Sequence, residues 1–158
     1  MSKEHRYKLN ITWTGNKGVC TQSYRSYDRS HTISFPGKED ILASADPAFH
    51  GDSSKYNPEE FLLAALSTCH MLWFLHLCAD KGVIVISYSD EPTGLMIEAS
   101  EGGGRFKEVM LNPTVIVTEK SMLSTLDELH EQAHKKCFIA NSVNFPVTHI
   151  GNYSVIEI

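Results

Sequence analysis

The chain has 158 residues, of which 42% are hydrophobic and 21% are charged, and its net charge is −5 at pH 7. This composition is that of a soluble globular protein of about the size of one domain, with enough apolar side chains to build a core. The acidic balance and the scattered Lys and Arg residues argue against a nucleic-acid-binding protein, which usually presents a basic face.

The N-terminal segment is charged and lacks the apolar stretch of a signal peptide, so we expect a cytoplasmic protein. In that compartment its cysteines are mostly reduced, and a disulfide is more often catalytic than structural. Residues 7–14 alternate between apolar and polar side chains, which predicts a half-buried strand. Residues 19–27 and 31–35 are predicted to form further strands, and residues 38–56 a long irregular loop of the kind that often carries function.

A long helix is predicted over residues 57–80. Asn57 can cap it, Pro58 suits its first position and Glu60 completes a capping box. Residues 61–79 carry no formal charge and are long enough to cross a bilayer, but they include several polar side chains. These are Ser67, Thr68, His70 and His76. A helix that is apolar all round is usually buried, so we favour a buried central helix over a membrane span.

The second half of the chain is predicted to contain several strands and one more helix. Strands are expected over residues 83–89, 95–100, 105–111, 114–118 and 153–158. The second helix is expected to begin at Ser121 or Ser124, and its apolar residues form one stripe. The stripe consists of Met122, Leu126, Leu129, Ala133 and Cys137. This order of elements, without repeats or linkers, predicts a single α+β domain over residues 1–158.

The four cysteines differ in what their positions predict. Cys69 lies in the middle of the long helix, where spacing alone favours a small buried apolar residue. Cys137 ends the apolar stripe, so it should face the core and could meet Cys69. Cys78 lies nine residues after Cys69, on the opposite helical face and about 13 Å away, which is beyond the reach of a disulfide. Cys20 lies in a predicted strand without an obvious partner.

Two motifs carry a resemblance to a known family. The first is Asn57-Pro58-Glu59-Glu60 followed by an apolar helical run that ends at Cys69. The second is the segment from Ala133 to Cys137, followed by Ile139, Ala140 and Asn141. In sequence and in order they resemble the motifs of the osmotically inducible protein C (OsmC) and organic hydroperoxide resistance (Ohr) family. Residues 27–31, 43–49 and 69–72 resemble an OsmC-like branch of this family. Phe138 departs from the family pattern, which commonly has proline after the second cysteine.

The resemblance implies a thiol-dependent peroxidase that reduces organic hydroperoxides in oxidative-stress defence and needs no cofactor. It implies that Cys69 attacks the peroxide, that Cys137 resolves the product as a disulfide, and that a lipoyl-type or thioredoxin-like dithiol is the reductant. By resemblance, Arg29 stabilises the Cys69 thiolate and Glu59 orients the arginine. Arg25 is the second choice for the arginine.

His50 and Lys55, in the predicted loop, are further candidates for the positive charge beside the thiolate. Glu59 also has a simpler interpretation, because a carboxylate in the first helical turn favours the helix dipole.

The expected fold has antiparallel sheets, a long buried central helix and a second helix, assembled as an intertwined homodimer. Glu59 and Cys69 are ten residues apart, which is about 15 Å along one helix, so one straight helix cannot bring them into a compact site. A site assembled across two subunits solves this difficulty, and the resemblance implies the same dimer. No membrane or nucleic-acid partner is expected.

Two other classes of function remain open. Cys69 with His76, and His134 with Cys137, form two pairs at helical spacing that could together bind zinc. A non-catalytic protein that binds a small molecule in an apolar pocket between subunits is the second alternative.

Overall fold

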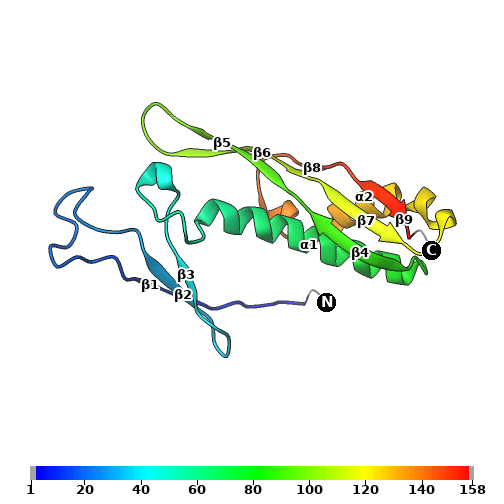
Figure 1. The fold of residues 1–158 in the computed structure, drawn as a ribbon, viewed down its shortest axis with the longest axis horizontal. Helices are drawn as coiled ribbons and strands as arrows, with labels where there is room; N and C mark the ends of the chain where they lie inside the picture. Colours follow the sequence, from blue (N-terminus) through cyan, green and yellow to red (C-terminus); the bar gives the residue numbers. More distant parts are fainter. Residues whose placement is uncertain (1–2, 157–158) are drawn as a thin grey trace. The chain divides into compact units, whose positions relative to one another are not determined.

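The computed structural model describes residues 3–156 (Figure 1). Contacts divide the chain into two compact units, Met1–Phe61 and Leu62–Ile158. The secondary structure confirms an α+β protein with two α-helices. The single domain over residues 1–158 stays a prediction.

The first unit contains a small antiparallel sheet. Strands β1 (Asn10–Trp13), β2 (His31–Ser34) and β3 (Ile41–Ala43) pair in that order, followed by the 3-10 helix η1 (Pro47–Phe49). The register places Ile11 opposite Ile33, and Ile33 opposite Ile41, so one face of the sheet is apolar. The predicted strands over residues 7–14 and 31–35 are therefore confirmed in their central parts, while β3 lies inside the segment predicted to be a loop.

The strand predicted over residues 19–27 is wrong, because this segment forms turns. The side-chain oxygen of Asn16 accepts hydrogen bonds from the backbone N–H groups of Gly18 and Cys20, at 2.9 and 3.1 Å. Gly18 and Cys20 both have positive φ angles, which are incompatible with a strand. This local asparagine turn overrides the strand propensity of the residues that follow.

Helix α1 (Pro58–Asp80) begins and ends as its sequence predicts. The side chain of Asn57 accepts from the Glu60 N–H at 2.9 Å, and Glu60 accepts from the Asn57 N–H at 3.0 Å, which is a complete capping box. At the other end Gly82 takes a φ of 72°, and Val83 donates its N–H to the carbonyl of Cys78. These features are those of a Schellman motif.

The second unit contains two three-stranded sheets. Three segments of the chain each contribute one strand to one sheet and the next strand to the other. Strand β4 (Val85–Asp90) continues into β5 (Thr93–Glu98), β6 (Gly104–Leu111) into β7 (Pro113–Val117), and β8 (Val147–His149) into β9 (Asn152–Val155). One sheet has the order β4-β7-β9 and the other β5-β6-β8.

Both sheets of the second unit are mixed, because β8 pairs in parallel with β6 and β9 in parallel with β7. The expectation of antiparallel sheets is therefore corrected for this unit. The strand predicted over residues 153–158 is β9 as far as Val155, and residues 157–158 lie outside the described residues. Strand β8 was not predicted.

Between β7 and β8 the chain forms the 3-10 helix η2 (Lys120–Thr125), helix α2 (Leu126–Lys136) and the 3-10 helix η3 (Ala140–Ser142). The apolar stripe expected for the second helix is seen in Leu126, Leu129 and Ala133, which are all buried. Cys137 follows directly as the C-terminal cap of α2.

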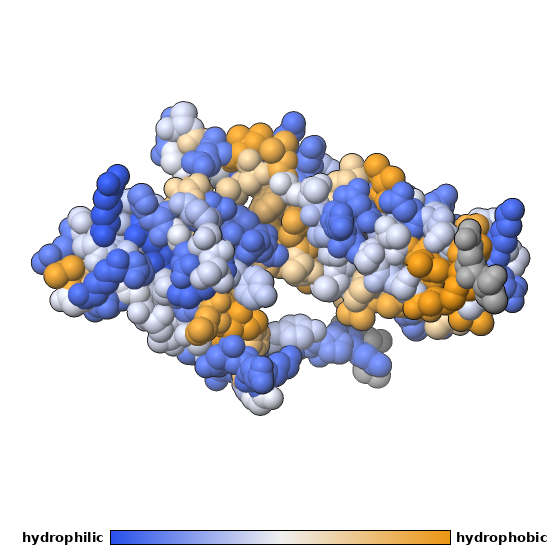
Figure 2. Space-filling model, in the orientation of Figure 1, coloured by the Kyte–Doolittle hydropathy of each residue, from blue (hydrophilic) through white to orange (hydrophobic). Residues whose placement is uncertain are grey.

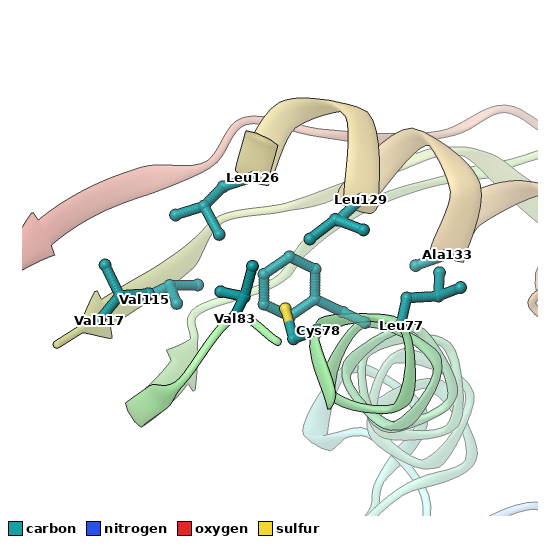
Figure 3. Packing of buried hydrophobic residues seen from close by; sticks show 9 residues of the cluster. Leu77, Cys78, Val83, Val115, Val117, Leu126, Leu129 and Ala133 are labelled. Carbon is teal, nitrogen blue, oxygen red and sulfur yellow. The ribbon is translucent and has the colours of Figure 1, made fainter. Parts of the chain in front are cut away.

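Helix α1 takes part in two hydrophobic clusters. Near its C-terminal end, Phe74, Leu77 and Cys78 pack with residues from β7 and α2 (Figure 3). Further towards its N-terminus, Leu66 packs with Val109, Leu111 and Val147 of the other sheet. Only one face of α1 is buried in the single chain, since Leu72 is 62% exposed. The expectation of a helix buried all round therefore does not hold for one chain alone.

Polar contacts separate the two clusters at the level where the strands are interrupted. Asp90, the last residue of β4, accepts a hydrogen bond from the Ser67 hydroxyl of α1 at 2.5 Å. It also accepts from the backbone N–H of Asn112, between β6 and β7, at 2.7 Å. One carboxylate therefore fixes α1 at the end of β4 and at the break between β6 and β7.

By length and composition alone α1 could cross a membrane. Its buried face, however, carries Ser67 and His70, each of which is hydrogen-bonded to a side chain of another element. These contacts bind this face of α1 to β4 and α2 within the second unit.

Replacement of Asn57 by alanine should lower the free energy of unfolding by about 1 kcal/mol, because the N–H of Glu60 loses its acceptor. Urea unfolding followed by circular dichroism measures the change. Asn57→Asp keeps an acceptor and should lie within a few tenths of a kcal/mol of the wild type. Equal destabilisation by both substitutions would contradict the importance of the cap.

Candidate functional site

The Cys69 thiol lies close enough to the Cys137 thiol to affect its ionisation. Cys69 lies on α1 and is partly buried, whereas Cys137 caps α2 and is 1% exposed. Burial raises the pKa of the Cys137 thiol to about 11, and the neighbouring Cys69 thiol contributes to this rise. At rest Cys137 is therefore a neutral thiol held beside Cys69.

The chain after α2 wraps around Cys137. The backbone N–H of Ala140 points at the Cys137 sulfur at 3.4 Å, which opposes part of the rise in its pKa. The Cys137 carbonyl accepts from the N–H of Asn141, whose side chain donates to the carbonyl of Lys135 at 3.0 Å. This local loop fixes the second cysteine and gives its sulfur a hydrogen-bond donor for the ionised form.

Aromatic side chains flank the two cysteines in sequence and pack on one another. Trp73 and Phe138 meet edge to face with ring centroids 5.8 Å apart, and the Lys136 ammonium lies 5.4 Å from the Trp73 centroid. Phe138, at the position where the family commonly has proline, is 69% exposed. We call Trp73 and Phe138 the aromatic shelf. Further hydrophobic residues are exposed on the face of the molecule that Figure 2 shows.

Arg29 is held firmly in the first unit. Its guanidinium lies over the rings of Tyr24 and Tyr27, at 4.3 and 4.4 Å from their centroids. It donates to the backbone carbonyls of the same two residues at 2.5 and 2.6 Å. Arg25 is exposed and makes no hydrogen bond or ion pair with any of residues 3–156. Of the two arginines, Arg29 is thus the one with a fixed position.

The other two candidates for positive charge lie beside Arg29. His50, Lys55 and Arg29 line one small polar cavity of about 270 Å³. Lys55 is already paired, because its ammonium lies 3.1 Å from the Asp52 carboxylate and 2.9 Å from the Ser30 hydroxyl. Arg29 makes no such ion pair with the residues that the structure describes.

Glu59 lies in the first turn of α1, where its charge favours the helix dipole. Its Oε2 atom is buried and has no hydrogen-bond partner within residues 3–156. A buried carboxylate oxygen normally has a donor. A purely local role at the helix terminus therefore leaves this oxygen unexplained.

A cluster of histidines, which the sequence analysis did not identify, lies in the core of the second unit. The Nε2 atom of His70 on α1 lies 2.8 Å from the Nδ1 atom of His130 on α2. The ring of His149, on β8, lies 5.3 and 5.5 Å from these two rings, and His134 lies 6.2 Å from His149. We call these four residues the histidine cluster. One signal was present, since His130 lies four residues after Leu126 on the buried stripe of α2.

No group of three or more His, Cys, Asp or Glu side chains among residues 3–156 is arranged to hold a metal ion. In the first pair of the zinc alternative, His76 instead lies 3.5 Å from Asp80 on the surface of α1. The zinc alternative therefore gains no support from the described side chains.

Comparisons with known proteins agree on one family. The sequence model described as OsmC-like protein matches residues 51–150. An OsmC-like protein of unknown function from Vibrio cholerae is similar to the chain, with 35% identity and a TM-score of 0.84 over 94% of this chain and 99% of the other. The chain is also similar to a Legionella pneumophila structure described as an organic hydroperoxide resistance protein OsmC, with 15% identity and a TM-score of 0.67 over 96% and 99% of the two chains.

Among curated proteins, the uncharacterised YmaD of Bacillus subtilis is 21% identical over 143 residues, which cover 89% of this chain and 87% of YmaD. The similarity extends over nearly the whole of both chains.

Alkylation by iodoacetamide at about pH 8 should label Cys20 and Cys69 before Cys78 and Cys137. Cys20 is exposed and Cys69 partly buried, while burial raises the pKa of both Cys78 and Cys137 to about 11. A thiol with that pKa is ionised to only about 0.1% at pH 8. Mass spectrometry of each cysteine peptide gives the rates, and the differences should vanish in urea. Equal labelling of Cys20 and Cys137 in the folded protein would contradict this order.

Proposed function

The chain belongs to the OsmC-like protein family, and from this membership we propose that it is a cytoplasmic thiol-dependent peroxidase that reduces organic hydroperoxides. The observation that carries the proposal is the proximity of Cys69 to Cys137, which places a partly exposed thiol near a buried one. Relatives described as organic hydroperoxide resistance proteins share the fold.

In the proposed reaction the Cys69 thiolate attacks one oxygen of the hydroperoxide. A sulfur–oxygen bond forms, the O–O bond breaks, and the alkoxide leaves as an alcohol after taking up a proton. The Cys137 sulfur then attacks the sulfenic acid of Cys69. A disulfide forms, and the hydroxyl group leaves as water with the proton of Cys137. A lipoyl-type or thioredoxin-like dithiol restores both thiols and becomes a disulfide itself.

The buried Cys137 suits the second step. Its raised pKa keeps it from reacting as a thiolate with peroxide in solution. Its position beside Cys69 gives the sulfenic acid a nearby thiol, and the N–H of Ala140 favours negative charge on the Cys137 sulfur as it reacts.

The aromatic shelf supports a preference for bulky substrates. Trp73 and the exposed Phe138 offer apolar surface close in sequence to both cysteines. Each Å² of alkyl or aryl surface that they bury in the transition state stabilises it by about 25 cal/mol. Hydrogen peroxide has no such surface, so we expect it to react more slowly.

We propose further that Arg29 stabilises the Cys69 thiolate and that Glu59 orients the arginine, in a homodimer where a second copy of the chain completes the site. Support comes from the fixed guanidinium of Arg29 and from the unpartnered Oε2 of Glu59. Exposed apolar side chains on α1 and β4, such as Leu72 and Ile86, need a cover.

Replacement of Cys69 by serine should reduce the consumption of cumene hydroperoxide at least about 1,000-fold, because the attacking sulfur is lost. Cys78→Ser keeps both reacting thiols and serves as the control, with activity close to the wild type. In wild type, peroxide should produce a Cys69–Cys137 disulfide within one chain. In Cys137→Ser, Cys69 should proceed to the sulfinic acid, and mass spectrometry distinguishes the two products.

Full activity of Cys69→Ser would refute the peroxidase. Equal rates with cumene hydroperoxide and hydrogen peroxide would refute the role of the aromatic shelf and leave the thiol chemistry intact.

Co-expression of Cys69→Ser and Arg29→Gln chains, carrying different tags, tests the shared site. Each variant alone should be inactive. If Arg29 of one chain serves Cys69 of the other, the purified mixed dimer has one intact site and about half of the wild-type activity. An inactive mixed dimer would place both residues of a site on the same chain. Arg25→Gln is the matched control and should be fully active alone.

A further inference from the structure

The hydrogen bond between His70 and His130 connects the two helices that carry the reacting cysteines. His70 follows Cys69 on α1, and His130 lies on α2, seven residues before Cys137. Their facing nitrogens are 2.8 Å apart, and the two side chains are 1% and 0% exposed. This bond therefore holds α2 against α1 from within the core, two helical turns from Cys137.

The second nitrogen of each ring, which faces away from the His70–His130 hydrogen bond, is here called the outer nitrogen. His70 Nδ1 and His130 Nε2 are buried and have no hydrogen-bond partner among the described residues. Phe74 stacks on His130 at 3.8 Å between ring centroids. In the neutral pair the ring that donates has a free lone pair on its outer nitrogen, and a proton added there would place a positive charge in an apolar site without an acceptor, which is strongly unfavourable.

The titratable groups that face the pair do not neutralise such a charge. From β8 comes His149, whose Nε2 lies 3.6 Å from the Glu131 carboxylate at the edge of the cluster. From α2 comes His134, next to His149. Protonation of either would repel a charge on His70, and neither carries a negative charge to offset it.

Two tyrosines complete the surroundings. Tyr88 of β4 lies 6.4 Å from His130, between ring centroids, and its hydroxyl is buried without a partner in the described residues. Tyr153 of β9 stacks on His130 at 5.7 Å and donates its hydroxyl to Asp127 at 2.7 Å. The Asp127 carboxylate is thus already engaged, and burial raises the pKa of both tyrosines, which stay neutral.

A neutral imidazole pair can share one hydrogen across the 2.8 Å gap, with one nitrogen donating and the other accepting. When both rings are protonated, both facing nitrogens carry hydrogen, and the attraction becomes repulsion between two cations. The pair therefore exists only while at least one ring is neutral.

We propose that the His70–His130 hydrogen bond is a pH-sensitive latch between α1 and α2, which opens in mild acid and exposes Cys137. The consequence for catalysis rests on the function proposed above, because an open latch separates Cys137 from Cys69. The opening itself does not depend on any reaction with peroxide.

The direction of the pH dependence follows from the burial of the rings. Burial lowers the pKa of His70 to about 4 and that of His130 to about 3 in the closed form, while open, solvated rings return to the ordinary value of about 6.5. The open form thus binds more protons below pH 6.5. The closed form has its full advantage above that pH and loses it as the pH falls towards 4. Between pH 7 and pH 5, opening should increase about 25-fold for each ring that takes up a proton.

The test measures access to Cys137 in the full wild-type chain with N-ethylmaleimide at about pH 7 and about pH 5. Mass spectrometry gives the labelling rate of Cys137 relative to exposed Cys20, which corrects for the lower reactivity of every thiol in acid. The relative rate should rise at least about 10-fold at the lower pH. An unchanged relative rate would overturn the latch.

The double substitution His70→Gln and His130→Asn provides the matched variant. The Gln amide can occupy the place of His70 Nε2 and the Asn amide that of His130 Nδ1, so a hydrogen bond is kept without a group that titrates. In this variant the relative rate should stay within about twofold between the two pH values. His76→Gln, on the exposed side of α1, should keep the full wild-type rise. A rise in the double variant equal to that of the wild type would refute the latch.

If the double variant does not fold, nitrogen NMR of the imidazoles in the wild type provides a second test. His70 and His130 should both be neutral at about pH 6 while the protein is closed. Protonation of both rings with Cys137 still protected would overturn the latch. If Cys137 labelling in the wild type depends on pH as expected but the protein shows no peroxidase activity, only the proposed function is refuted.

Discussion

The attachment of α1 at the level where one sheet of the second unit gives way to the other is the constraint on which this unit depends. The three chain segments of its sheets are interrupted near Asp90, Asn112 and Ile150, and the helix lies across that level. A backbone N–H left bare at such a break would cost about 1–3 kcal/mol. The Asp90 carboxylate accepts one of these groups and the Ser67 hydroxyl at the same time. The helix position and the strand break are therefore fixed by one side chain.

This arrangement explains why polar and reactive groups collect in the middle of α1. The hydrophobic clusters lie towards its two ends, with Leu66 in one and Phe74 in the other. Between them the helix presents Ser67, Cys69 and His70 within a single turn. The scaffold thus places titratable side chains inside a core, where the pKa values of histidines and thiols respond strongly to burial.

Patterns within a few residues of sequence predicted the elements that short-range contacts determine. Asn57 and Glu60 form the capping box that their spacing predicts, and the buried stripe of α2 follows its period. The strand expected over residues 19–27 does not form, because the side chain of Asn16 imposes a turn on the backbone of Gly18 and Cys20. Strand β8 was missed because its three residues, Val147–His149, are too few to show an alternation of apolar and polar side chains.

The site shows the same division. Both motif cysteines could be found from the sequence, and facing helical stripes predicted that they could meet. The pairing of His70 with His130 joins residues 60 positions apart, and no local pattern records such a contact. The roles proposed for Arg29 and Glu59 would likewise need contacts between distant segments, so the sequence alone offers candidates for them and no geometry.

The position of Trp73 gives the protein an optical signal of its own. The chain has two tryptophans, and Trp73 rests on Phe138, the residue directly after Cys137. If Cys137 forms the proposed disulfide, the residue after it, Phe138, is moved or restrained, and the polarity around the Trp73 indole changes with it. Trp13, which donates its N–H to the Asp28 carbonyl in the other unit, supplies a constant background. Intrinsic fluorescence can therefore follow the oxidation state of the cysteine pair in real time without any attached dye.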